Sequence, residues 1–106
     1  MSYKIVIIGE KDDILPYHSI GLEIEPVKTR EETINALKKV TRDSSVGIIL
    51  ITENMAEQCL DTITGLRNKT SKTMSIIPTQ QENRGVSVKE LKKEIGRSVG
   101  IDILAK

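Results

Sequence analysis

Three carboxylates follow the first apolar run of the sequence and are its strongest candidates for chemistry. Glu10, Asp12 and Asp13 come directly after the run that ends at Gly9. In an open parallel sheet, ligands bind beyond the carboxyl ends of the strands, at the point where the strand order reverses. Carboxylate oxygens are among the ligands that Mg²⁺ prefers in proteins. One hypothesis is therefore a Mg²⁺ site at the acidic pair Asp12 and Asp13.

The same stretch, IVIIGEKDD, is similar to the start of a response-regulator receiver domain, in which an acidic pair follows the first strand. That family also requires a phosphorylatable Asp at the end of the third strand, where this sequence has Leu50, Ile51 and Thr52. Its fifth strand and the Lys before that strand are missing as well. A receiver-like signalling domain that binds Mg²⁺ at Asp12 and Asp13 stays as the alternative. The competing interpretation is that Asp12 caps a helix.

A nucleotide site is not predicted at this edge. Dinucleotide and P-loop sites need several glycines so that backbone N–H groups can approach the phosphates, and this edge offers only Gly9. The next junction, after the apolar run VGIILI, offers Thr52, Glu53 and Asn54. These three residues form no known set of catalytic groups.

The single histidine and the single cysteine do not complete a site either. His18 has Ser19 beside it in the sequence, which gives no useful geometry for a nucleophile and its base. Cys59 lies on an apolar helical stripe and is predicted to be a small core residue. A single cysteine also fits a reducing cytosol. The sequence therefore predicts no catalytic residue, no cofactor and no metal site, and hence a protein that is not itself an enzyme.

Composition restricts the class of protein further. The 106 residues fit one domain. Apolar residues make up 38%, with no Phe or Trp, so the core must consist mainly of Ile, Leu and Val, as in parallel sheets covered by helices. The net charge of +1 gives no strongly basic face, and nucleic-acid binding is not predicted. The apolar run at the N-terminus is too short for a signal peptide or a membrane span, so we expect a cytoplasmic protein without direct membrane insertion.

Four strands alternate with helices along the chain. The strands are predicted over residues 3–8, 22–27, 46–51 and 73–78. This alternation indicates an α/β fold with a four-stranded parallel sheet of order 2-1-3-4 and flanking helices, Rossmann-like or receiver-like, plus a C-terminal helix and tail. The second strand alternates apolar and acidic residues, which is typical of an edge strand.

The helices between these strands have recognisable ends. Asp12 is predicted to cap the first helix, and Gly21 to stop it. Thr29 and Glu32 form a capping box for the second helix. The third helix is predicted to begin near Thr52 and to end near Gly65, with its apolar stripe at Ala56, Cys59, Leu60 and Ile63.

The last part of the chain is organised differently. We predict an α/β body over residues 1–78, a polar linker over 79–86, and a helix with a tail over 87–106, where Ser87 and Glu90 form a second capping box. The stripe of this helix either covers the body's own sheet or packs against the helices of a partner. The candidate partner-binding residues are Val88, Leu91, Ile95, Val99, Ile101, Ile103 and Leu104.

Several segments together resemble the F subunit of V-type (A/V-type) ATPases. The stretch VGIILITENMAE is similar to that family's Gly-Ile-Ile-x-Ile-Thr-Glu segment and its following helix, matched from Gly47 to Glu53. The opening IVIIGEKDDILPYHSIGLE, the Ile-Pro pair that ends the fourth strand, and the closing Val-Gly-x-x-Ile, matched at Val99, Gly100 and Ile103, occur in the same order as in the family. The resemblance covers essentially the whole chain.

This resemblance implies a non-catalytic subunit of the central stalk of a rotary ATPase. Its expected partners are the D subunit of the V-type ATPase stalk, the coupling subunit on the membrane side and, transiently, the A₃B₃ head. It would help couple ATP turnover to ion translocation and would be peripherally associated with the membrane through the complex. On this interpretation the junction after the third strand is structural, because Thr52 caps the helix and Glu53 favours the positive end of its dipole.

Overall fold

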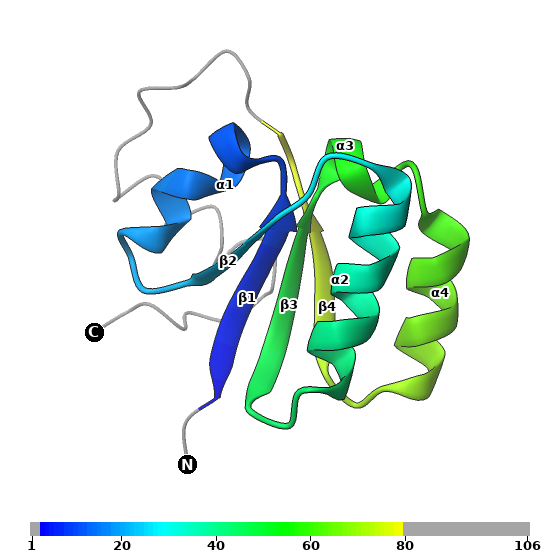
Figure 1. Cartoon of the computed structure of the whole chain (residues 1–106). Helices are drawn as coiled ribbons and strands as arrows, with labels where there is room; N and C mark the ends of the chain where they lie inside the picture. Colours follow the sequence, from blue (N-terminus) through cyan, green and yellow to red (C-terminus); the bar gives the residue numbers. More distant parts are fainter. Residues whose placement is uncertain (1–2, 80–106) are drawn as a thin grey trace.

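The computed structural model of the chain describes residues 3–79, which form a parallel sheet with helices on both faces (Figure 1). Its strands are β1 (Lys4–Gly9), β2 (Glu23–Pro26), β3 (Val46–Thr52) and β4 (Thr73–Ile77). All neighbouring strands pair in parallel, in the order β2-β1-β3-β4. The predicted α/β fold and strand order are therefore confirmed.

One face of the sheet carries the larger core. It is covered by α2 (Arg30–Arg42), α3 (Glu53–Ala56) and α4 (Leu60–Lys69), with α2 and α4 side by side in Figure 1. Val6, Ile8, Ile49 and Ile51 of the central strands pack there against Leu37 and Val40 of α2 and Ile63 of α4. The capping box predicted for α2 is present, because Glu32 N donates to Thr29 Oγ1 at 3.1 Å and the Glu32 carboxylate accepts from Thr29 N.

The opposite face has a smaller cover, in which α1 (Lys11–His18) packs over the strands. Ile14 and Tyr17 of this helix are buried against Ile7, Leu50 and Ile77. Ile5, Ile24 and Ile48 are only half-buried on this face. The two faces of the sheet are thus covered unequally by residues 3–79.

The first helix begins earlier than its sequence indicates. Glu10 holds the N-cap position, so the prediction of Asp12 as the cap is wrong. Asp12 and Asp13 lie in the first turn instead, where negative charge favours the positive end of the helix dipole. Gly21 follows the helix with a φ of +96°, a value that side chains disfavour, and this turn leads the chain into β2.

The segment after β3 forms two helices, not the single helix that its sequence predicts. The chain turns between Ala56 and Leu60, and Cys59 takes the N-cap position of α4 with φ −145° and ψ 39°. Because of this turn Leu60 is 50% exposed and does not share the buried stripe of Ala56, Cys59 and Ile63. Gly65 lies inside α4 and does not end it.

Candidate functional site at the carboxyl edge of the sheet

The reversal point of the strand order lies between the carboxyl ends of β1 and β3, where Gly9 lies against side chains of β3 and α1. A Cβ at Gly9 would stand 2.6 Å from Thr52 Cγ2 and 2.7 Å from Ile14 Cγ2. Real Cβ atoms do not approach other atoms so closely, so Gly9 is what allows β3 and α1 to close over the end of β1. The ends of β1 and β3 are thus closely packed at the point where this fold class binds ligands.

Thr52 does not act as the cap that its position predicts. It holds the N-cap position of α3, but its side chain makes no capping hydrogen bond. Its Oγ1 is buried without a hydrogen-bond partner among the described residues. The side chain turns toward Gly9 instead of the helix N-terminus, and Asn54 Oδ1 accepts the hydrogen bond of Met55 N at 3.0 Å.

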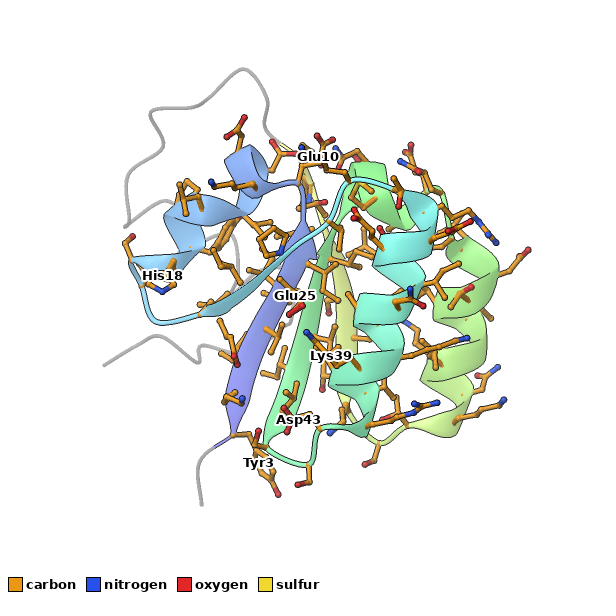
Figure 2. The ribbon with its side chains drawn as sticks, viewed as in Figure 1. Tyr3, Glu10, His18, Glu25, Lys39 and Asp43 are labelled. Carbon is orange, nitrogen blue, oxygen red and sulfur yellow. The ribbon has the colours of Figure 1, made fainter. Side chains whose placement is uncertain are left out.

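Asn54 connects the two acidic residues to the end of the sheet. Its Nδ2 donates to Glu10 Oε1 at 3.2 Å and to Asp13 Oδ2 at 3.4 Å. Its Oδ1 accepts from Thr79 Oγ1 at 3.1 Å. Glu10 is labelled in Figure 2, at the edge where these residues meet. These four residues thus form one hydrogen-bond network, and they come from the segments that follow β1, β3 and β4.

The two members of the acidic pair have different surroundings. Asp12 is exposed in the first turn of α1, whereas Asp13 is half-buried and bonded to Asn54. Among residues 3–79 the structure brings together no group of three or more His, Cys, Asp or Glu side chains that could hold a metal ion. The geometry of this part therefore adds no support to the Mg²⁺ hypothesis.

The remaining candidates for chemistry lie apart from this edge. His18 is exposed at the end of α1 (Figure 2). Cys59 is 2% exposed, as predicted for a core residue, and its Sγ donates to Met55 O at 3.5 Å. Burial raises the pKa of the Cys59 thiol, against a smaller opposing effect of Arg30. A buried thiol with a raised pKa is a poor nucleophile.

Three ion pairs lie near the edge strand β2 and the amino end of β1. Lys4 Nζ lies 3.0 Å from Glu23 Oε2 and 3.6 Å from Asp43 Oδ2. The hydrogen bond to Glu23 is the largest of the effects that raise the pKa of Lys4. Lys39 of α2 pairs with Glu25 of β2, and Figure 2 shows the two side chains facing each other. The pairs of Glu23 and Glu25 link β2 to β1 and α2, and the pair of Asp43 links β1 to the end of α2.

The residues predicted to bind a partner lie outside the described part of the chain. Val88, Leu91, Ile95, Val99, Ile101, Ile103 and Leu104 all follow Thr79, as does most of the predicted linker. The boundaries at 78 and 87 therefore stay predictions. Within residues 3–79, no helix has the length and apolar character that crossing a bilayer requires.

Comparison with known proteins gives a consistent result over the whole chain. Residues 5–95 match the family described as ATP synthase (F/14-kDa) subunit. The chain is 24% identical over 104 residues to the F subunit of the V-type ATP synthase of Clostridium botulinum (strain Eklund 17B / Type B), with 98% of this chain and 100% of that protein covered. It is 28% identical over 104 residues to the F subunit of the A-type ATP synthase of Methanococcus maripaludis (strain C7). That alignment covers 94% of this chain and 98% of the methanococcal protein.

A solved structure shares the fold. The crystal structure of the F subunit of the V-type ATP synthase from Archaeoglobus fulgidus superimposes with a TM-score of 0.59 at 18% identity, covering 70% of this chain and 95% of that one. At 18% identity, this structural similarity shows a common fold and no more. The family match rests on the sequence itself, and its residues 5–95 span most of the chain. The chain belongs to the ATP synthase (F/14-kDa) subunit family.

Proposed function

We propose that this chain is a central-stalk subunit of a rotary V-type ATPase, in which it binds the D subunit and helps couple ATP turnover to ion translocation. The observation that carries the proposal is the extent of the family match. It begins in β1 and continues to residue 95, beyond the α/β body and into the predicted partner-binding helix. The clostridial and methanococcal relatives match over nearly their full length, so the similarity is not confined to a common α/β architecture.

The chemistry of the body supports a role in binding over a role in catalysis. Thr52 and Ile14 pack closely against Gly9 at the edge where this fold class binds ligands, and the acidic residues Glu10 and Asp13 accept hydrogen bonds from Asn54. A domain of this kind acts through the surfaces that it presents. In the proposed complex the body docks on the stalk and supplies no active site of its own.

The C-terminal segment would make the main contact with the D subunit. Val88, Leu91, Ile95 and Val99 recur at helical spacing. An apolar stripe of this kind fits the groove between two partner helices, where it is anchored at positions i, i+3 and i+7. The tail residues Ile101, Ile103 and Leu104 would extend this contact. The polar residues 79–86 would let the helix change its position relative to the body.

Other contacts follow from the same assembly. The coupling subunit on the membrane side would be the second stable neighbour, and the A₃B₃ head a transient one. The chain would be held at the cytoplasmic face of the membrane by the complex alone, with no segment of its own in the bilayer. No nucleic acid takes part in this function.

The experiment is direct mixing of the purified chain with the D subunit, followed by size-exclusion chromatography with light scattering. A stable one-to-one species is expected. Two separate elution peaks with unchanged masses would contradict the proposal. The A₃B₃ head, mixed with the chain in the absence of the D subunit, serves as the control and should form no stable complex.

A further inference from the structure

Asn54 uses every hydrogen-bonding position of its side-chain amide. The amide carries two donor hydrogens and an oxygen with two lone pairs. The donors reach Glu10 Oε1 at 3.2 Å and Asp13 Oδ2 at 3.4 Å, and the oxygen accepts from Thr79 Oγ1 at 3.1 Å and Met55 N at 3.0 Å. If the Asn54 amide were rotated by half a turn, its NH₂ group would face the N–H of Met55, and two donors cannot form a hydrogen bond with each other. The network therefore allows one orientation of Asn54.

Thr79 is held to the start of α3 by two contacts. Its hydroxyl donates to Asn54 Oδ1 at 3.1 Å and accepts from Asn54 N at 3.4 Å. Thr79 follows Pro78, whose ring fixes φ at about −65°, and Pro78 follows Ile77, the last residue of β4. The chain thus leaves the sheet through one residue of fixed φ and one residue held by its side chain.

We infer that Asn54 and Thr79 are positioning residues for the partner-binding segment, because they fix where the chain leaves the body. This inference rests on the proposed function of residues 87–106. A binding segment whose starting point is already fixed loses less conformational freedom when it binds. Asn54 is itself held by Glu10 and Asp13, so the exit of the chain is tied to α1 and α3 together.

The position of Thr79 separates this role from a purely structural one. A structural role for Asn54 would consist of tying α3 to α1 through Glu10 and Asp13, and Thr79 takes no part in those two hydrogen bonds. Thr79→Val keeps the branched shape and removes only the hydroxyl. Thr79→Ser keeps the hydroxyl and removes only a methyl group. The pair therefore tests the hydrogen bonds and not the packing.

The test measures the affinity of the full-length chain for the D subunit by calorimetry. Thr79→Val removes both hydrogen bonds of the Thr79 hydroxyl. It is expected to weaken binding by at least about two- to tenfold, the loss that corresponds to a single ordinary hydrogen bond, while Thr79→Ser binds like the wild type. The urea midpoint of the body is expected to fall slightly in Thr79→Val, because both lost hydrogen bonds join Thr79 to Asn54 of α3, and to stay unchanged in Thr79→Ser. Adding Asn54→Ala to Thr79→Val should cost less than the sum of the two single effects, because both remove the same contact. Equal affinities for Thr79→Val and Thr79→Ser would overturn the inference.

A second measurement tests the role of Thr79 in the isolated chain, so that it does not depend on binding of the D subunit. In the isolated full-length chain, ¹⁵N relaxation order parameters of residues 79–82 are expected to fall in Thr79→Val but not in Thr79→Ser, with those of β1 and β3 unchanged. Equal order parameters in the two variants would overturn the inference even if the D subunit does not bind. Absence of binding by the wild type would contradict the proposed function and leave this comparison valid.

Discussion

Thr52 fills the space beside Gly9 in which any other residue would place its Cβ. The distance from that Cβ position to Thr52 Cγ2 is 2.6 Å, and the distance to Thr52 Oγ1 is 2.7 Å. The two residues stand at the ends of β1 and β3, where related folds bind their ligands. This contact packs the carboxyl ends of β1 and β3 closely together.

Gly9→Ala should be strongly destabilising for this reason. The added methyl group has to displace Thr52 or Ile14, and overpacking of this kind costs about 1–3 kcal/mol. Urea denaturation monitored by circular dichroism gives the free energy of unfolding. Gly65→Ala is the matched control, because a Cβ there meets nothing within 4 Å and the position lies inside α4. This control should raise stability by about 0.5–1 kcal/mol. Equal effects of the two substitutions would contradict the close packing at Gly9.

Thr52→Val should be tolerated, although it removes a polar group from a helix N-cap position. The Thr52 hydroxyl is buried and makes no hydrogen bond within residues 3–79, so its removal leaves no partner unsatisfied. We expect the free energy of unfolding to stay the same or to rise by up to about 1 kcal/mol. Thr29→Ala, which removes a hydroxyl that does cap its helix, should cost about 1 kcal/mol. A loss of the same size in Thr52→Val would show that its hydroxyl has a capping role after all.

Asp43 should make the stability depend on pH in the acid range. Hydrogen bonds from the Ser45 side chain and backbone, more than the charge of Lys4, hold the pKa of Asp43 below its ordinary value of 3.8. A carboxyl whose pKa is lowered by folding contributes stability that is fully present above the unfolded pKa and is lost as the pH falls through the folded pKa. Denaturation at a series of pH values should therefore show wild type and Asp43→Asn converging below pH 3.8. A difference that stays constant with pH would contradict this role.

The sheet could be predicted from local sequence because its central strands β1 and β3 are short runs of apolar residues between turn residues, and β2 alternates apolar and acidic residues as an edge strand does. Residues 48–51 are such an apolar run. The capping box at Thr29 marks the start of α2 just as clearly. The spacing of these elements gives the parallel order. The strands and the helix cap could therefore be predicted, because they depend on residues that are neighbours in the sequence.

The roles of residues that depend on contacts between distant parts of the chain could not be predicted from the sequence. Thr52 has the residue type and position of a cap, but packing against Gly9 decides where its side chain points. Cys59 starts a new helix because of the turn before it, which no Gly or Pro announces. Asn54 joins Glu10 and Thr79, which are 44 and 25 residues away in sequence. In the sequence, the role of Asn54 was indicated only by its polar side chain and by its place after the third strand, at the edge where the acidic pair was expected.

Binding of the D subunit by the apolar stripe of the C-terminal segment is tested by measuring the affinity of Leu91→Asp/Ile95→Asp for that subunit. Lys93→Asp is the control, because it changes the net charge by the same amount and its spacing puts it away from the stripe. The account predicts that the double variant loses at least about tenfold in affinity, as expected when two buried anchors are lost, while Lys93→Asp binds like the wild type and both variants keep the urea midpoint of the body. Unchanged affinity of the double variant, or unfolding of its body, would contradict the account.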